Sequence, residues 1–225
     1  DFSEYIRDDL ESVIKMLTDG CESACDEIDE LENVSDSLKG NKDFMNIVVT
    51  NNGSALELAS EVLKKDRQIT MRALANGHGD MYQDIHSDFH DDKEIALHAL
   101  DNWEMSDQPD ILHYCSNELR EDFDIVMKSV AIQGCSLSHA ETADMEDKEK
   151  KEIFLTAIGN DEEAYLYIED LYKNDNDFNK ELVNINFKVL GRMTEEVFDV
   201  IKSDLMIEEY TKKNNDIEEK IEEVK

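Results

Sequence analysis

The sequence is poor in basic residues, in proline and in long apolar runs, and each shortage excludes a class of protein. It has 23 Lys and Arg against 56 Asp and Glu, and its formal net charge is -33. Like charge repels nucleic acid and anionic lipid, so we expect no direct binding of DNA or RNA and no membrane attachment. No apolar run approaches the roughly 20 residues of a membrane-spanning helix. No signal peptide is recognisable, and a soluble, cytoplasmic protein is expected.

The four cysteines, Cys21, Cys25, Cys115 and Cys135, have neither a CxxC spacing nor the density of a disulfide-stapled domain. Reduced thiols are therefore expected. Cys135 and His139 lie four residues apart, but a cysteine and a histidine on one helical face are more often packing residues than a catalytic pair. The 40% hydrophobic content is enough to bury a core, so we expect a folded chain.

A short apolar motif recurs along the chain and indicates tandem repeats. The copies lie 25 to 30 residues apart and read FMNIVV from Phe44, ITMRAL from Ile69, IALHAL from Ile95, IVMKSV from Ile125, IFLTAI from Ile153 and a degenerate FNKELV from Phe178. A second periodic segment follows each copy, with apolar residues four apart as on one helical face. The pattern predicts helix pairs, with about 10 to 18 residues per helix, that stack on their neighbours.

Residues that favour helix ends punctuate these repeats. Short polar residues, which accept hydrogen bonds from the free amides at a helix start, precede five of the copies by three positions: Asn41, Asp66, Asp92, Asp122 and Asp175. The IFLTAI copy has Lys150 at that position, so its cap is placed at Asp147. Glycines expected to end the first helices with a positive φ follow four copies: Gly53, Gly77, Gly134 and Gly159.

Together these signals predict an all-α fold of tandem two-helix repeats, stacked as an α-solenoid-like single domain. The domain is expected to cover residues 1–206 with about seven helical hairpins. Residues 207–225 alternate in charge sign and are expected to form a charged terminal helix or tail. The oligomeric state is left open.

The stretch NNGSALELASEVLKKDRQITMRAL, from Asn51 to Leu74, resembles the domain of unknown function 4116 family. The resemblance lies in an NG turn, an ALxxAS helix, an LxxD junction and an IxxxAL helix, with weaker copies over about residues 40–171. Later copies depart from it, since Gln133 and Gly134 replace the NG turn in one of them. The resemblance implies an all-α repeat fold found in viruses and microbes, and it implies no activity.

Chemical motifs are scarce. His86 and His90 lie four residues apart, a spacing at which two imidazoles can share a metal ion. Aspartate is abundant everywhere and no HExxH motif supplies a base, so two surface histidines are the simpler interpretation, and metal binding there stays open. Calcium loops, phosphate loops and nucleophile constellations are not recognisable. We therefore predict no catalytic residue, metal or cofactor, and a protein that is not an enzyme.

One acidic cluster is a candidate contact surface for a partner. In the stretch ESACDEIDELENVSD, a helix would turn Ile28, Leu31 and Val34 inward and leave an outer stripe of carboxylates. The alternative is a face that is merely solvated. The candidate partner-binding residues are Glu22, Asp26, Glu27, Asp29, Glu30, Glu32 and Asp36.

Two functions remain open. The first is a phage or viral inhibitor that acts as a nucleic-acid mimic and occupies the basic, nucleic-acid-binding surface of a defence or nucleic-acid-handling protein. Each repeat would carry about four net negative charges over roughly 10 Å, against about six on duplex DNA. The second is a helical-repeat scaffold that binds a peptide or protein on its concave face. Some side chains could form a recognition patch, although packing in the core and between repeats is the favoured explanation for them: Trp103, Met105, Tyr114, Tyr165, Tyr167 and Tyr172. Charge favours the first function.

Overall fold

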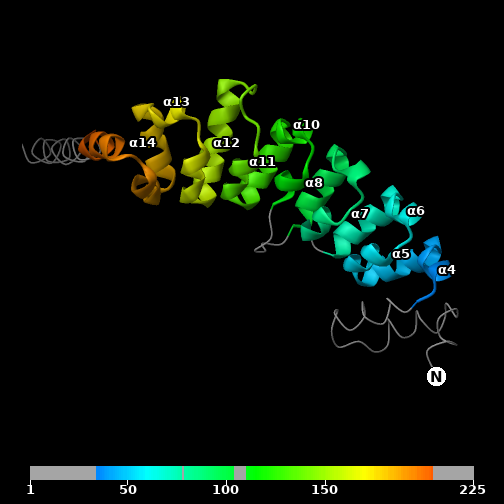
Figure 1. Ribbon diagram of the computed structural model, residues 1–225. Coiled ribbons are helices and arrows are strands. Elements are labelled where there is room, and N and C mark those ends of the chain that lie inside the picture. The colour runs from blue at the N-terminus through cyan, green and yellow to red at the C-terminus, as the bar shows by residue number, and fades with distance from the viewer. Residues whose placement is uncertain (1–33, 78, 104–109, 205–225) are drawn as a thin grey trace, which may run out of the picture.

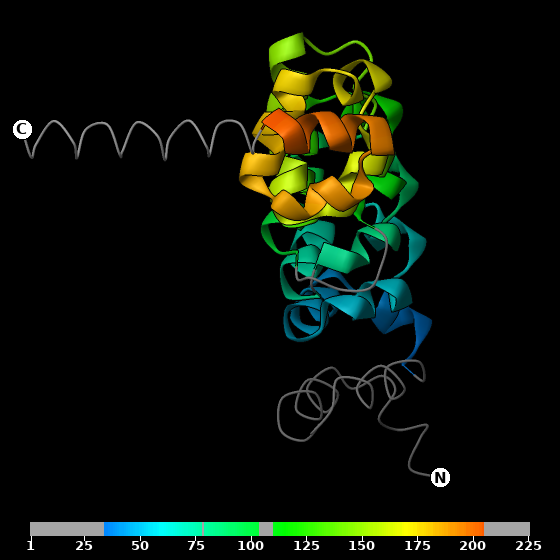
Figure 2. The same cartoon turned by 90° about the vertical axis from the view of Figure 1, so that its left-hand side faces the viewer.

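The computed structural model describes residues 34–77, 79–103 and 110–204, and helices alone form the regular structure of these ranges. The predicted all-α class is therefore confirmed. Figure 1 shows the repeats side by side in chain order along an arc. Figure 2 views the stack from its C-terminal end, where the orange helices lie in front of the earlier repeats. Within the described ranges, no helix combines the length and apolarity that spanning a membrane requires.

A long α-helix carries the apolar motif of each repeat. These helices are α5 (Lys42–Asn51), α7 (Arg67–Asn76), α8 (Lys93–Asp101), α11 (Phe123–Ile132), α12 (Asp147–Asn160) and α14 (Asn176–Ile185). All five predicted caps are confirmed, because each side chain accepts from the amides two and three residues further on. The prediction for α12 is wrong by one residue. Glu146 is its cap, and the carboxylate of Glu149 accepts the Glu146 amide at 3.1 Å.

The second segment of a repeat is not one continuous helix, which corrects the prediction. In the repeat after α5, the 3-10 helix η1 (Gly53–Leu58) comes first and the one-turn helix α6 (Glu61–Lys64) follows. Ala59 and Ser60 between them are extended, both with ψ of 151°. The extended backbone frees the Ser60 amide to donate to the carbonyl of Lys39 at 3.0 Å, in the preceding repeat. The break therefore provides a backbone bond between repeats.

The same arrangement recurs along the stack. Ser116 donates to the carbonyl of His90, and Glu141 to that of Arg120, each at 3.0 Å. The short helices α4, α6, α10 and α13 follow one another along the upper edge of the arc in Figure 1. The remaining elements are α4 (Asp36–Lys39), η2 (Gly79–Gln83), η3 (Ser87–Phe89), α9 (Ile111–Tyr114), α10 (Asn117–Arg120), η4 (Gly134–His139), η5 (Glu162–Tyr167), α13 (Asp170–Lys173), η6 (Phe187–Arg192) and helical residues 195–204.

The apolar motif forms a core that runs through the whole stack. In α5, the side chains at positions three, four, seven and eight of the helix are buried, and α7, α8, α11 and α14 bury the same positions. The longer α12 buries the equivalent set four positions later. In α7 these positions include Ile69, Ala73 and Leu74, all 0% exposed. Each long helix packs against the next one, and all except α8 pack against the 3-10 helix that follows them; α8 packs against α9 instead. A repeat is thus stabilised mainly by its neighbours.

The prediction that the glycines end the first helices with a positive φ is wrong. Gly53, Gly77 and Gly134 do not have a positive φ, and Gly159 lies inside α12. Gly53 and Gly134 begin 3-10 helices that touch the next long helix. A Cβ on Gly53 would lie 2.1 Å from the carbonyl oxygen of Ala73, and one on Gly134 2.3 Å from that of Ala157. Glycine is required at these two positions because consecutive repeats approach too closely for a side chain.

Candidate functional site

The long helices begin along one edge of the stack, where cations link each helix start to the next. We call this the N-terminal edge. The first residue of one helix forms an ion pair with the cap carboxylate of the following helix in three successive pairs: Lys42–Asp66, Arg67–Asp92 and Lys93–Asp122. The series ends at α11, whose first residue is Phe123. Because these ion pairs are between helix starts, they place the starts of α5, α7, α8 and α11 next to one another.

Each of the three paired cap carboxylates, Asp66, Asp92 and Asp122, both caps its own helix and binds a cation of the previous repeat. In Asp122, Oδ1 accepts from the amides of Asp124 and Ile125 at 3.1 and 3.2 Å, while Oδ2 accepts from Nζ of Lys93 at 2.8 Å. Lys93 also donates to the carboxylate of Asp124 at 2.7 Å. Asp122 therefore caps its own helix and also forms an ion pair that links this helix to the previous repeat.

The ion pairs help to lower the pKa of two of these cap carboxylates, Asp66 and Asp92. The hydrogen bond from Lys42 lowers the pKa of Asp66, although burial opposes the shift. Burial is the largest influence on Asp92 and raises its pKa, but Arg67 and the backbone amides of Ile95 and Glu94 together outweigh it, so the pKa is lowered. The pKa of Arg67 is raised in turn, mainly by its bond to Asp92. At neutral pH the edge therefore carries full charges of both signs.

Further carboxylates lie beside these pairs: Glu94 pairs with Arg67, Asp124 with Lys93 and Asp177 with Lys180. The second residue of four long helices is an exposed carboxylate, and a positive helix dipole stabilises it there: Asp43, Glu94, Asp124 and Asp177. The short helices α6, α10 and α13 also have an exposed acid in their first turn. Carboxylates consequently follow the starts of successive helices along the stack, and this row is the candidate contact surface.

The predicted acidic stripe lies mostly outside the described residues. Of its seven members only Asp36 is described, as the exposed first residue of α4, and its carbonyl oxygen accepts the amide of Gly40 at 3.0 Å. The other six, Glu22, Asp26, Glu27, Asp29, Glu30 and Glu32, precede residue 34. The stripe therefore stays a prediction. Residues 207–225 and the cysteines Cys21 and Cys25 also lie outside the described ranges.

His86 and His90 use their ring nitrogens in separate hydrogen bonds. Nδ1 of His86 accepts from the amide of Asp88 at 3.1 Å, and Nε2 of His90 lies 3.1 Å from the carbonyl oxygen of Tyr82. Each ring is thus oriented by a backbone group that lies close to it in the sequence. Among the described residues, no group of three or more His, Cys, Asp or Glu side chains is placed to hold a metal ion.

The two described cysteines are free thiols in environments that suppress ionisation. Burial raises the pKa of Cys115 to about 11. Burial and the neighbouring carboxylate of Asp161 raise the pKa of Cys135 to about 12. Its thiol donates to Oδ2 of Asp161 at 2.8 Å, so the structure pairs Cys135 with this carboxylate and not with His139. Neither thiol forms the thiolate that nucleophilic catalysis requires at neutral pH.

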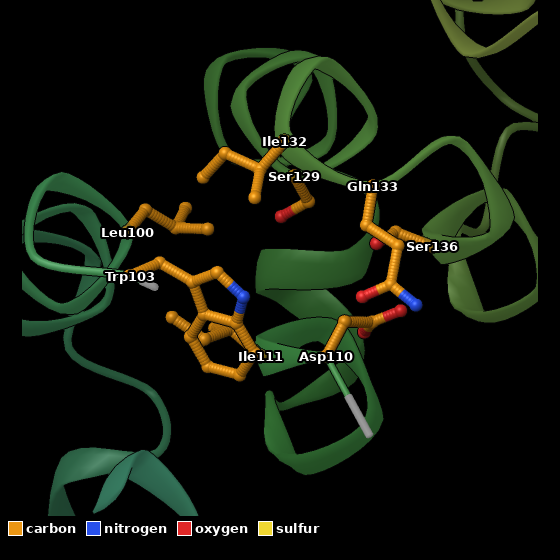
Figure 3. A pocket seen from close by; sticks show the side chains of 8 residues that line it. All are labelled: Leu100, Trp103, Asp110, Ile111, Ser129, Ile132, Gln133 and Ser136. Carbon is orange, nitrogen blue, oxygen red and sulfur yellow. The ribbon is translucent and has the colours of Figure 1, made fainter. Parts of the chain in front are cut away.

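The described surface has narrow openings. One crevice, shown in Figure 3, lies between the end of α8, α9 and the junction of α11 with η4. Trp103 and Leu100 form one wall and Gln133 and Ser136 the other, with Asp110 beside them. The crevice leaves no space for a water molecule, and Ser136 Oγ is buried in it without a hydrogen-bond partner. It is a close-packed junction between repeats.

A wider cleft of about 260 Å³ lies between η5, α13 and helical residues 195–204. This volume is below the roughly 300–1,000 Å³ of typical ligand pockets. Lys173 and Arg192 line it, but Lys173 donates to the carbonyl of Leu166 at 2.9 Å and Arg192 to the carboxylate of Glu163 at 2.7 Å. The cations of this cleft are therefore already engaged.

The aromatic candidates divide between core and surface. Tyr165 and Tyr172 are buried, at 3% and 4% exposure, whereas Tyr167 is 47% exposed, as expected for tyrosines two positions apart. Trp103 and Tyr114 are partly buried against the core. Most of the set therefore packs between repeats. Tyr167, Leu166 and Leu171 are exposed large apolar side chains within six residues of η5 and α13, and we call these three residues the apolar patch.

This fold defines the class of the protein, which is an all-α protein of tandem helical repeats. A family model described as "Domain of unknown function (DUF4116)" matches residues 27–64, 41–78 and 92–142. These segments are similar to repeats of that family, in agreement with the resemblance at residues 51–74. No curated protein and no solved structure matches the chain. The family description assigns no activity, so a function has to be inferred from the surfaces of the chain itself.

Proposed function

We propose that this chain is a non-enzymatic, cytoplasmic binding protein whose carboxylate row occupies a basic, nucleic-acid-binding surface of another protein. In this function it is a nucleic-acid mimic, of the kind that a phage or virus uses to inhibit a defence protein. The observation that carries the proposal is the series of helix starts along the N-terminal edge, where Asp66, Asp92 and Asp122 are each held at a fixed position by capping and by an ion pair.

The spacing of the row is compatible with a phosphate backbone. The starts of α8, α11 and α14 each have two carboxylates, one at the cap and one at the second helical residue, whereas α5 and α7 have one. Packed helices lie roughly 10 Å apart, a length over which one DNA strand carries about three phosphates. Across the starts of α5, α7, α8 and α11, six such carboxylates stand beside three paired cations, so the row is much less charged than a single strand. The net charge of -33 adds a long-range attraction for a basic partner.

Capture from a host lysate at low and at high salt, with and without duplex DNA, tests this function. We expect the retained proteins to be nucleic-acid binders, to be displaced by the DNA, and to be lost at high salt because screening weakens exposed charge pairs. Retained proteins that do not bind nucleic acid, or that DNA fails to displace, would refute the mimic.

Matched variants test the row itself. The edge variant combines Asp43→Asn, Asp124→Asn and Asp177→Asn, and the control combines Glu57→Gln, Glu152→Gln and Asp199→Asn, which are equally exposed but lie away from the helix starts. Both lose the same charge. We expect the edge variant to bind a captured target about tenfold more weakly at low salt, mainly through slower association. Equal losses in the two variants would assign the binding to overall charge and remove the row as the contact surface.

A protein-interaction scaffold is the second candidate, and the patch of Leu166, Tyr167 and Leu171 favours it. These side chains are 56%, 47% and 74% exposed, and exposed aromatic and aliphatic side chains anchor protein interfaces. Binding through this patch should survive high salt. It should weaken in a Tyr167→Ala, Leu171→Ser variant and be unaffected in the edge variant, so the two functions predict opposite results for the same pair of proteins.

A further inference from the structure

Two histidines from consecutive repeats face each other at the surface. His113 belongs to the one-turn helix α9 and His139 is the last residue of η4. Nδ1 of His113 lies 3.3 Å from Nε2 of His139, and the rings meet edge to face. His113 is exposed, and the side chain of His139 is 33% exposed. The facing nitrogens are therefore within reach of solvent.

A buried carboxylate orients both histidines. Asp110 caps α9, and its side chain is only 8% exposed. Its Oδ1 accepts the backbone amide of His113 at 3.1 Å, and its Oδ2 lies 3.3 Å from Nδ1 of His139. A carboxylate at Nδ1 favours the tautomer with the proton on that nitrogen, which leaves a lone pair on Nε2 of His139. That lone pair is on the side of the ring where His113 lies.

We propose that His113 and His139 form a binding site for a transition-metal ion of the Zn²⁺ class, with Asp110 as the positioning residue behind His139. Nitrogens that bind tetrahedral Zn²⁺ at about 2.0 to 2.1 Å lie about 3.3 to 3.4 Å apart, and the two ring nitrogens are separated by 3.3 Å. A carboxylate on the far nitrogen of a ligating imidazole is the usual support of such a ligand. The two histidines provide half of a tetrahedral set, and water completes it from the solvent side.

The site would join neighbouring repeats, because its ligands come from α9 and η4. A metal bound only by the folded arrangement stabilises that arrangement. The acidic surface also concentrates divalent cations without any specific site. A test must therefore separate binding by imidazoles from binding by carboxylates, and Mg²⁺ does so because it prefers oxygen ligands and competes poorly for imidazole.

Calorimetric titration with Zn²⁺ in a large excess of Mg²⁺ tests the proposal on the full chain. We expect one Zn²⁺ ion per chain, with binding weakened at least about tenfold in His113→Ala and in His139→Ala. His86→Asn is the matched control, since Nδ1 of His86 is engaged by the amide of Asp88 within its own turn. The Zn²⁺ affinity of this control should equal that of the unmodified chain. Binding that vanishes in Mg²⁺, or that persists unchanged in both alanine variants, would mean surface carboxylates only and would overturn the site.

Co²⁺ absorption and an Asp110→Asn variant test the positioning role. Tetrahedral Co²⁺ should absorb in the visible range in the unmodified chain and lose this band in both alanine variants. Asparagine still caps a helix, so Asp110→Asn should keep its far-ultraviolet circular dichroism while Zn²⁺ affinity falls about 10- to 100-fold. Unchanged Zn²⁺ affinity in this variant would refute the role of Asp110. Because these measurements use no protein partner, their failure leaves the proposed inhibitor function unaffected.

Discussion

Replacement of Gly53 by alanine should weaken the contact between two repeats, although the backbone at this position suits any residue. The added Cβ would lie 2.1 Å from the carbonyl oxygen of Ala73 and 2.4 Å from the amide nitrogen of Gly77. Ordinary contacts begin near 3.4 Å, so α7 would have to move by about 1.3 Å relative to η1. These obstacles are backbone atoms, which no side-chain rotation can relieve. Overpacking of this kind costs about 1 to 3 kcal/mol, and sometimes more.

Gly191→Ala is the matched control. Gly191 lies in η6 and is exposed, and a Cβ added there would meet no atom of the described residues within 4 Å beyond its own chain neighbours. Without a clash, replacing glycine by alanine stabilises a protein by about 0.4 to 1 kcal/mol, because the unfolded chain loses conformational freedom. The two variants should therefore shift stability in opposite directions and differ by about 1.4 to 4 kcal/mol.

Urea unfolding followed by circular dichroism measures this difference. With a slope of about 3 kcal/mol per molar urea, the midpoint of Gly53→Ala should fall about 1 M below that of Gly191→Ala. Because a repeat array unfolds interface by interface, an early phase that involves the α5 to α7 region is also expected. A midpoint for Gly53→Ala equal to or above that of the control would refute the close approach of the two repeats.

Three further predictions concern charge. Arg67→Gln should lower the free energy of unfolding by about 1 kcal/mol or less at low salt, because Arg67 pairs with Asp92 and Glu94 while its side chain stays 38% exposed. A urea midpoint no lower than that of Arg72→Gln, on the same helix, would contradict this prediction. The pKa of Asp66 is lowered by Lys42 from 3.8, so its contribution is complete above the unfolded pKa and disappears as pH falls through the lower, folded value. The difference in free energy of unfolding between the unmodified chain and Asp66→Asn should therefore be constant near neutral pH and shrink below about pH 4. A difference that grows on acidification would refute the lowered pKa of Asp66. Moderate salt should raise the melting temperature, because screening relieves the repulsion of a net charge of -33; a melt that is insensitive to salt would count against a densely charged folded surface.

Much of the fold could be predicted from short stretches of sequence. The caps Asp66 and Asp122 bond to amides two and three residues away, and the buried positions of each long helix repeat within two turns. Both features depend on contacts inside one helix, so the local pattern is enough to predict them. The acidic composition likewise predicted that the surface charge is negative. Its arrangement along successive helix starts was not predicted, because it requires that neighbouring long helices begin at the same edge.

The sequence by itself determined the all-α class, the repeat length and the starts of the long helices, because these depend on interactions between residues within about one or two helical turns. Only the tertiary structure decided where a repeat bends, since the break at Ser60 is fixed by a bond to Lys39 in the previous repeat. It also decided that Gly53 lies in a close contact and that His113 meets His139. Each of these contacts joins residues 20 or more positions apart, and they exist only once the repeats have stacked.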